Sequence, residues 1–414
     1  MALNLSLTMT DCPVGTNKQG SLIIAGSGIA SICHITLETV SLMETAEKIF
    51  YLVTDPITEA YIQEKNNNTV NLCKYYNKTK QRYQSYVEMA EVMLREVRAE
   101  HKVLGIFYGH PGFFATPAHR ALTLARAEGY AARMIPGISS FDYMLSDLEF
   151  EPALYGCTIH DATDLLARDR HLDPSAHNII LQIAAAGVTT LEDEPENSKL
   201  PLLITHLERH FGLDHKVILY SGAVFPLSST AMVVYTIENL RNPQVAEGIS
   251  SSSSLYIPPR DIPPINSSMS NKLQLHDYAL PLLGTPPVWE GSRFINSVTY
   301  GPVERRFVAG LDQHVTPSSH RTLHASPAMR KFMIELALNR ASQHEYRRNP
   351  VAVSESVSNL TDRERFALGS AHAGAIHLVM SRTSHEEPTK EQLEAVSKLE
   401  GDCVLDDPKY SAAF

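Results

Sequence analysis

The chain has 414 residues, of which 43% are hydrophobic and 20% are charged. This length and composition allow two or three domains with a large buried core, and they exclude a mini-protein and a largely disordered chain. The formal net charge of −10 argues against a surface built to bind polyanions, so we expect no nucleic-acid partner.

The cysteines and the N-terminus indicate where the protein resides. The 5 cysteines lie far apart and form no CxxC pair, which favours a reducing compartment over a disulfide framework or a zinc ribbon. Residues 1–20 lack the basic and apolar regions of a signal peptide, and no run of about 18 apolar residues occurs. We therefore predict a soluble, cytoplasmic protein with no membrane partner.

Short apolar runs alternate with helical patterns from residue 21 to about residue 256, which predicts an α/β layered domain. We expect buried strands at residues 22–25, 49–53, 103–107, 179–181 and 217–219. Apolar residues at steps of three and four predict a helix that covers the sheet, with its stripe at residues 86, 89, 90, 93, 94 and 97. Ligands of such sheets bind in the loops after the strands, here residues 26–28, 108–112 and 136–139.

The composition changes at Ser250–Ser254, a serine run followed by several proline pairs, and this change predicts a domain boundary. Beyond it, Ser326 before a proline is typical of a helix start, with an apolar stripe at residues 329, 332, 333 and 336. Thr361 and Glu364 have the spacing of a capping box. We predict a small helical domain here, followed by an acidic, polar and weakly folded C-terminal end.

Two strand-end loops contain residues that could bind a ligand. The loop that begins at Gly26 resembles the start of a dinucleotide fingerprint but lacks its third glycine, so a plain tight turn is the alternative. In Tyr108–Gly112, His110 lies among glycines and a proline, where it could orient a substrate or simply bond the backbone of a shaped loop. No second ligand accompanies it at a fixed helical spacing, so we expect no metal site.

A polar stretch before the predicted helix contains several phenols and one guanidinium, at residues 75, 76, 82, 83 and 86. A fixed cation such as Arg82 beside phenols could stabilise negative charge that develops on a carbonyl oxygen, while a phenolate takes a proton. The alternative is a solvated helix start with tyrosines packed at its edge. Motifs of common hydrolases, nucleotide-phosphate enzymes and zinc proteases are missing from the sequence.

Three motifs in order resemble the S-adenosylmethionine-dependent tetrapyrrole (corrin/porphyrin) methylase fold: Gly-Ser-Gly-Ile, Tyr-Gly-His-Pro-Gly and Ile-Pro-Gly-Ile-Ser. More narrowly, the chain from Gly20 to about Met380 resembles the borosin peptide backbone α-N-methyltransferases, fungal enzyme–precursor fusions typified by the omphalotin precursor. The stretches that carry this resemblance include Lys-Tyr-Tyr followed by Arg-Tyr-Gln-Ser-Tyr, then Leu-Tyr-Ile-Pro-Pro and Leu-Thr-Asp-Arg-Glu-Arg-Phe-Ala-Leu.

The resemblance implies a tetrapyrrole methylase-like (class III) α/β methyltransferase domain, a small helical clasp domain and a flexible C-terminal tail. We expect a flexible N-terminus at 1–19, the methyltransferase at 20–250, the linker and clasp at 251–380, and the tail, with a possible core peptide, at 381–414. The implied enzyme iteratively automethylates its own tail, in trans within a homodimer with exchanged clasp and tail. The chain would then be the precursor of a ribosomally synthesised and post-translationally modified peptide.

The resemblance also implies the site. Arg82, Tyr76 and Tyr86 match the catalytic arginine and tyrosines, and the sequence does not choose which tyrosine acts as the base. The cofactor would be S-adenosylmethionine, which leaves as S-adenosylhomocysteine. The residues expected to bind it are Gly28, Tyr108, His110, Pro111, Phe113, Ser139, Ser140, Gln182, Tyr220, Ser253 and Ser254.

Two departures from the family pattern keep alternatives open. Cys73 stands where the family commonly has a further active-site tyrosine. Family tails end in small and branched apolar residues, whereas residues 401–414 here are short and polar, and Pro408 has no N–H to methylate. The alternative functions are a methyltransferase that acts on a separate peptide or a small molecule, with the tail not a substrate, and a scaffold without activity.

Overall fold

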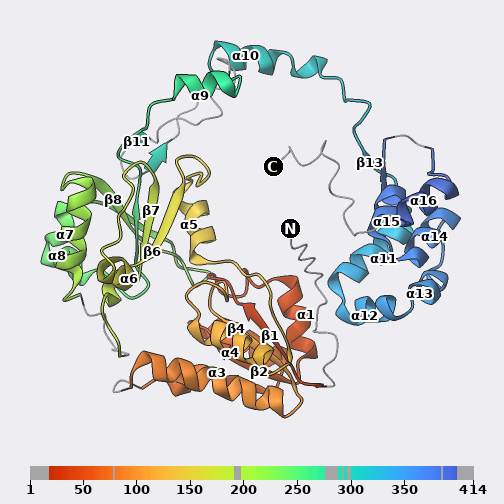
Figure 1. The fold of residues 1–414 in the computed structure, drawn as a ribbon, viewed down its shortest axis with the longest axis horizontal. Coiled ribbons are helices and arrows are strands. Elements are labelled where there is room, and N and C mark those ends of the chain that lie inside the picture. Colours follow the sequence, from red (N-terminus) through yellow and green to blue (C-terminus); the bar gives the residue numbers. More distant parts are fainter. Residues whose placement is uncertain are drawn as a thin grey trace. The chain divides into compact units, whose positions relative to one another are not determined.

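The computed structural model describes residues 18–77, 80–190, 197–275, 288–290, 293–295, 300–383 and 386–398. The chain divides into two compact units, Met1–Val298 and Thr299–Phe414 (Figure 1). Among the described residues, no helix is both long enough and apolar enough to cross a membrane. The expected flexible N-terminus at 1–19 lies outside the described residues except for its last two.

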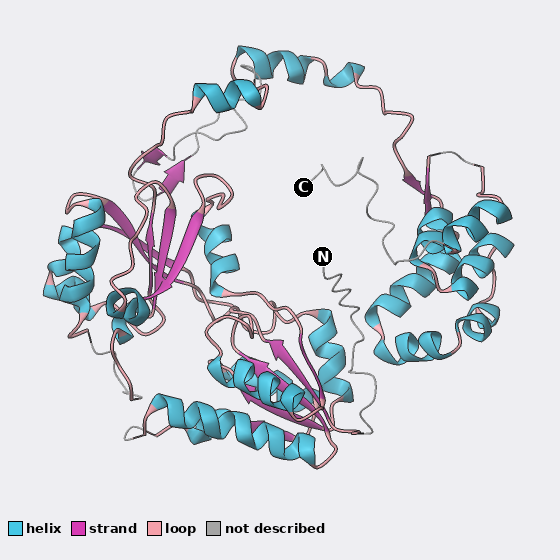
Figure 2. Cartoon of the chain, in the orientation of Figure 1, coloured by secondary structure: helices cyan, strands magenta, loops and turns pink. Residues whose placement is uncertain are grey.

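The first sheet of the first unit has 5 strands in the order β3-β2-β4-β1-β5, and all of their pairings are parallel. Figure 2 shows that this unit combines helices with strands. The strands are β1 (Ser21–Gly26), β2 (Lys48–Leu52), β3 (Thr69–Asn71), β4 (Lys102–Phe107) and β5 (Ala131–Met134). The apolar runs predicted at 22–25, 49–53 and 103–107 are confirmed as β1, β2 and β4. Such runs form central parallel strands because both of their faces are buried.

Helices cover both faces of this sheet, since alternate residues of each strand enter separate cores. One core packs against α1 (Leu37–Thr45) and α2 (Pro56–Lys65), and the other against α3 (Arg82–Arg98) and α4 (Thr116–Ala127). Residues 89, 90, 93, 94 and 97 of α3 are buried, which confirms the predicted stripe. The α/β layered domain predicted from the sequence is therefore present.

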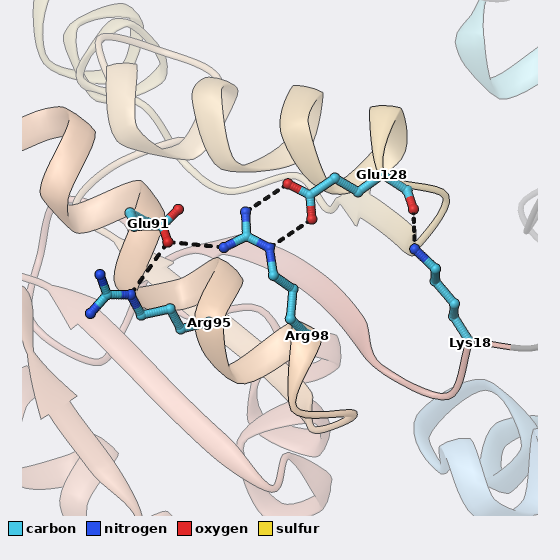
Figure 3. A network of polar contacts seen from close by, with 5 residues as sticks. All are labelled: Lys18, Glu91, Arg95, Arg98 and Glu128. Atoms are coloured by element: carbon cyan, nitrogen blue, oxygen red, sulfur yellow. Dashed lines mark hydrogen bonds and ion pairs between the residues drawn. The ribbon is translucent and has the colours of Figure 1, made fainter.

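A polar network joins the C-terminal ends of α3 and α4 (Figure 3). Arg98 donates to both carboxylate oxygens of Glu128, at 2.8 and 2.6 Å, and to Glu91 at 2.9 Å. Arg95 also donates to Glu91, and the Lys18 ammonium donates to the backbone carbonyl of Glu128. These contacts fix how α3 lies against α4, and α3 begins at the candidate site.

The second sheet of the first unit also has 5 strands, in the order β6-β7-β10-β8-β9, with parallel and antiparallel pairings. Its strands are β6 (Cys157–Asp161), β7 (His177–Leu181), β8 (Lys216–Ser221), β9 (Ala231–Thr236) and β10 (Ser254–Ile257). One core packs α6 (Ala162–Ala167) and α7 (Leu200–Phe211) against it, and α5 (Ser140–Leu148) packs on the other face. The remaining helical elements are η2 (Ile183–Ala185), η3 (Glu238–Arg241) and α8 (Pro243–Glu247). The runs predicted at 179–181 and 217–219 are confirmed in β7 and β8.

The structure differs from the domain boundary predicted between residues 250 and 251. Strand β10 follows that point, yet it pairs with both β7 and β8 in the middle of the second sheet. The serine run is an ordered turn, because the Ser250 amide donates to the Ser253 hydroxyl at 3.0 Å and the Ser253 amide to the Ser250 carbonyl at 2.9 Å. Serine-rich composition resembles a linker, but here the hydroxyls satisfy their own backbone. The helix α9 (Ser267–Lys272) and the pair β11 (Val288–Glu290) and β12 (Arg293–Ile295) come after β10.

The second unit is mainly helical. It contains α10 (Pro302–Ala309), η5 (Leu311–Gln313), α11 (Pro327–Leu338), α12 (Arg340–Arg348), α13 (Pro350–Ser356), α14 (Asp362–Ser370), α15 (Ala373–Met380), α16 (Lys390–Ser397) and the pair β13 (Thr322–Leu323) and β14 (Ser381–Arg382). The Ser326 cap of α11 and the Thr361–Glu364 capping box of α14 are both confirmed. The predicted stripe of α11 packs into this unit's own core.

The predicted start of the tail at residue 381 also differs from the structure. Helix α16 has a capping box, from Thr389 to Gln392, and its Leu393 is fully buried in the core of the second unit. A single buried leucine in an otherwise polar segment gives little periodicity, so the composition concealed this helix. Residues 399–414 lie outside the described residues.

Candidate active site

A cavity of about 430 Å³ lies in the first unit, between strand ends of its two sheets. Its volume is within the range of small-molecule and cofactor sites. The first sheet and its helices contribute Ile29, Leu52, Val53, Thr54, Cys73, Tyr76, Tyr86, Phe107, Tyr108, Gly109, His110, Phe113, Phe114, Ala115 and Pro117. The rest of the lining comes from α5, the second sheet and the serine turn, through Ser140, Tyr143, Leu181, Gln182, Tyr220, Gly222, Val224, Ser251, Ser252, Ser253 and Ser254.

Glycines let the loops after β1, β4 and β5 touch one another. The Gly28 amide donates to the Gly109 carbonyl at 3.2 Å, and the Gly109 amide donates back to the Gly28 carbonyl at 3.0 Å. A Cβ at Gly26 would lie 2.2 Å from the Gly109 carbonyl oxygen and 2.9 Å from the ring of Pro111. Gly28 and Pro111 are packed within these loops and are not among the residues that line the cavity. Their expected contact with a cofactor remains a prediction.

His110 combines features of both interpretations made from the sequence. Its Nδ1 accepts a hydrogen bond from the Gly112 amide at 3.0 Å, so the ring bonds the backbone of its own loop. The residue also lines the cavity. Because Nδ1 is an acceptor, a neutral ring carries its proton on Nε2 and can donate from that atom.

Two adjacent serines at the start of α5 have different roles. The Ser139 hydroxyl bonds the Asp142 carboxylate at 2.6 Å and accepts from the Asp142 amide at 3.1 Å, in a capping box. Ser139 is absent from the cavity lining, whereas Ser140 is part of it. Helix capping thus occupies the hydroxyl that the resemblance assigned to the cofactor.

The second sheet presents hydroxyl groups to the cavity. The Tyr220 hydroxyl donates to the Asp147 carboxylate at 2.7 Å, and the Thr230 hydroxyl donates to the same oxygen at 2.9 Å. Burial, and then the Asp147 carboxylate, raise the pKa of Tyr220 well above its usual range, so its phenol is neutral. Ser254 lies opposite Tyr220 in the β10–β8 register.

Gln182 and Tyr108 lie at the ends of β7 and β4. Gln182 has φ of +57°, a left-handed conformation that is unusual for a residue with a side chain and is often found at functional sites. Burial, and then the charge of Asp55, raise the pKa of Tyr108 to about 12. Both residues line the cavity, and their expected contact with the cofactor remains a prediction.

Tyr76 and Tyr86 both line the cavity, and Arg82 begins the helix that carries Tyr86. The two tyrosine rings meet edge to face with centroids 6.4 Å apart, and both residues line the cavity. Burial, and then Tyr86, raise the pKa of Tyr76, whereas the charge of the Arg82 guanidinium lowers it. Tyr83, with 63% of its surface exposed, has the solvated environment of the alternative interpretation, whereas Tyr76, Arg82 and Tyr86 are half-buried.

Arg82 is half-buried and lies just outside the cavity lining. Its backbone amide donates to the Thr189 carbonyl at 2.8 Å, which ties the start of α3 to the loop after η2. Its Nε is buried and has no hydrogen-bond partner among the described residues. A buried guanidinium donor without an acceptor is costly, and such a group often awaits a ligand.

Several lining residues were not assigned from the sequence. Val53 and Thr54 follow β2 and could have been found by the strand-end rule used for the other loops. Tyr143 lies one helical turn after Ser139, but nothing in its pattern distinguished it from a core residue. Val224 reaches the site because its carbonyl accepts from the Ser31 amide at 2.9 Å, a contact that no local motif predicts.

Comparisons with known proteins agree with this architecture. Residues 21–238 match the family model of the Tetrapyrrole (Corrin/Porphyrin) Methylases, and residues 299–404 match that of the Borosin biosynthesis clasp domain. The chain is 47% identical over 386 residues to a methyltransferase/ribosomally synthesized type I borosin cyclic peptide precursor of Serendipita vermifera subsp. bescii, covering 91% of this chain and 94% of the relative. A type I precursor of Mycena rosella is also 47% identical, over 384 residues, with 91% and 95% covered. A solved uroporphyrin-III-C-methyltransferase from Thermus thermophilus gives a TM-score of 0.42 at 19% identity, covering 63% of this chain and 99% of that chain.

The first unit is thus a methyltransferase of the tetrapyrrole methylase class, as the sequence motifs predicted. The second unit contains a borosin clasp, which confirms the predicted helical clasp and extends it beyond the expected end at residue 380. The chain belongs to the borosin family of methyltransferase/cyclic peptide precursor proteins.

Proposed function

We propose that this protein is an S-adenosylmethionine-dependent peptide backbone amide α-N-methyltransferase. It iteratively methylates its own C-terminal core peptide, in trans within a homodimer, and so is a precursor of a modified peptide. The names of its relatives, which combine a methyltransferase with a cyclic peptide precursor, support the fusion of enzyme and substrate. The clasp match over residues 299–404 supports the same organisation.

The cavity suits S-adenosylmethionine in size and in lining. His110 and Gln182 supply polar groups from strand ends of the two sheets, and Ser253 and Ser254 add hydroxyls from the serine turn. Tyr108 and Tyr143 offer aromatic faces, which attract a cation such as a sulfonium. When bound, this cofactor supplies an electrophilic methyl group on sulfur.

In this proposal Tyr76, Arg82 and Tyr86 must make a peptide nitrogen reactive. An amide N–H is too weak an acid to ionise in water at neutral pH, so a site that methylates it has to stabilise negative charge on the neighbouring carbonyl oxygen. Arg82 supplies a fixed positive charge at that place. Tyr76, whose raised pKa keeps it protonated, donates a hydrogen bond to the same oxygen. The amide proton passes to the Tyr86 hydroxyl as that hydroxyl releases its own proton to water, while the nitrogen–carbon bond forms and the methyl–sulfur bond breaks.

The observation that carries this proposal is the buried Nε of Arg82. Among the described residues this Nε has no acceptor, and the Arg82 charge lowers the pKa of Tyr76, a phenol that lines the cavity. A substrate carbonyl oxygen would satisfy this donor, and the interaction would strengthen as negative charge develops on that oxygen.

The test compares Arg82→Ala and Arg82→Lys with wild type by mass spectrometry of the C-terminal peptide and by calorimetry of S-adenosylmethionine binding. We expect methylation to fall by about 10²–10³-fold in Arg82→Ala, with cofactor affinity retained. Arg120→Ala is the matched control, since that exposed guanidinium contacts only the Tyr83 side chain in the described contacts. Unchanged methylation in Arg82→Ala would refute the proposed role of the cation.

The tail composition favours a second candidate, a methyltransferase that acts on a separate peptide. Residues 401–414 are polar and include Asp406, Asp407 and Pro408. A wild-type tail that stays at its unmodified mass after long incubation, together with methylation of an added apolar peptide, would establish this alternative and exclude automethylation.

A further inference from the structure

The segment Asn71–Tyr76 carries Cys73 and Tyr76 to the cavity wall. It is the end of β3 followed by the short turn η1 (Leu72–Tyr75). Leu72 is fully buried and anchors the turn in the core of the first sheet. A single 3₁₀ turn has weak internal hydrogen bonds, so its position depends on outside contacts.

Asn71 makes two of these contacts with one side chain. Its Oδ1 accepts from the Cys73 amide at 2.8 Å, which caps the turn. Its Nδ2 donates to the Glu59 carboxylate of α2 at 3.1 Å. The amide group therefore joins the turn to a helix on the opposite face of the sheet from α3.

Glu59 is itself fixed by neighbouring side chains. Its Oε1 accepts from the Tyr51 hydroxyl at 2.6 Å, and Gln63 donates to that hydroxyl at 2.9 Å. Tyr51 is 2% exposed and belongs to β2. Burial, and then the bond to Glu59, raise the pKa of Tyr51 to about 12, so its hydroxyl remains a donor. The carboxylate thus has a fixed position from which to hold Asn71.

The far side of the turn is held from α3. The Tyr75 carbonyl accepts from the Ser85 hydroxyl and from the Lys80 ammonium, both at 3.1 Å. Ser85 is 1% exposed, and Lys80 forms an ion pair with Glu88 at 2.6 Å. The turn is therefore tied on one side to α2 and on the other to α3.

We propose that Asn71, held by Glu59, is a positioning residue that sets the place of the Tyr76 phenol relative to Arg82. The proposal rests on the proposed function for what Tyr76 does. Asn71 itself is outside the cavity lining and acts through the turn. Its loss would displace a reacting group without removing any group that touches the substrate, and displacements of about 1 Å are known to cost on the order of 10²-fold in rate.

The test uses full-length Asn71→Ala, Asn71→Ser and the control Asn68→Ala, whose side chain bonds the exposed Lys48 and the Glu47 carbonyl instead. Serine can still cap the Cys73 amide but cannot reach Glu59. We expect kcat to fall by about 10-fold or more in Asn71→Ala, with the KM for S-adenosylmethionine unchanged, and to fall less in Asn71→Ser. Asn68→Ala should behave as wild type.

Hydrogen exchange at the Cys73 amide gives a readout that needs no activity. It should become faster in Asn71→Ala and stay slow in Asn71→Ser, which retains the acceptor. Unchanged exchange and kcat in Asn71→Ala would overturn the proposal, as would an equal loss of cofactor affinity. If Asn71→Ala fails to fold, unchanged kcat in Asn71→Ser would overturn it. A wild-type enzyme that methylates no peptide while the exchange differences hold would refute the proposed function alone.

Discussion

The two sheets of the methyltransferase unit contribute to the cavity in different ways. The first, all-parallel sheet contributes glycine loops that contact each other through their backbones, at Gly26, Gly28 and Gly109. The second, mixed sheet and the turn beside it contribute side-chain hydroxyls from Tyr220, Ser253 and Ser254.

This difference separates two tasks. Where two backbones approach closely, as at these glycines, there is no space for an added side-chain atom. A single hydroxyl hydrogen bond contributes little free energy, and a neighbouring group can partly replace it. The proposed reactive cluster of Tyr76, Arg82 and Tyr86 belongs to the first sheet's helix layer. The first half of the unit should therefore be more sensitive to single substitutions than the second.

Among the substitutions that test this comparison, Gly26→Ala should have the largest effect on stability and on cofactor binding. The new Cβ would lie 2.2 Å from the Gly109 carbonyl oxygen, so backbone would have to move. We expect a loss of about 1–3 kcal/mol in the free energy of unfolding and about tenfold or more weaker cofactor binding, measured by urea denaturation and calorimetry. The control Gly248→Ala places its Cβ 3.4 Å from the Val245 carbonyl at a φ of −80°, and it should be nearly neutral. Equal effects of the two would contradict the proposed sensitivity of the first half.

Lowering the pH should reduce the stability of the second half of the unit through His177 of β7. This histidine is 2% exposed, its Nδ1 lies 2.8 Å from the Tyr256 hydroxyl, and burial lowers its pKa from 6.5 to about 4. Between pH 6.5 and about 4, His177 is protonated in the unfolded chain and neutral in the folded chain. Stability is then complete above pH 6.5 and declines as pH falls towards about 4.

Urea denaturation at pH 7, 6 and 5 measures this slope, which should approach about 1.4 kcal/mol per pH unit from this residue. In His177→Phe the slope should flatten, whatever the stability at pH 7. The exposed His314→Gln is the control and should leave the slope as in wild type. A slope that His177→Phe leaves intact would assign the acid response to other groups.

Tyr220→Phe should have the smallest effect. It removes the hydroxyl that donates to Asp147, while Thr230 still donates to the same carboxylate oxygen. We expect about 1 kcal/mol less stability and a few-fold weaker cofactor binding. Tyr235→Phe, on the neighbouring strand β9, is the matched control. A loss as large as that of Gly26→Ala would show that the second half is not the more tolerant one.

The sequence predicted the parts of the fold whose apolar residues repeat regularly. The central strands β1, β2 and β4 and the stripe of α3 are examples. Strand β10 was missed because its ordered serine turn has the composition of a linker, and α16 because it buries only Leu393. Both elements are defined by tertiary partners rather than by local periodicity.

The sequence likewise predicted only part of the candidate site. The loop after β4 identified Tyr108 and His110, because the carboxyl ends of parallel strands collect ligands, whereas Gln182 came only from the family resemblance. No pattern could decide between Ser139 and Ser140, since the choice depends on which hydroxyl caps α5. The buried Nε of Arg82 and the Asn71–Glu59 contact required coordinates, because they depend on distances between separate elements.

The central position of β10 has a consequence for biosynthesis. A ribosome synthesises residues in order, so β7 and β8 leave the exit tunnel before β10, the strand that lies between them in the sheet. The sheet cannot be completed until Ile257, the last residue of β10, has also left the tunnel. The serine turn that borders the cavity is translated just before that strand. The cavity of a nascent chain therefore stays unfinished until the methyltransferase half is almost completely synthesised, and the clasp follows afterwards.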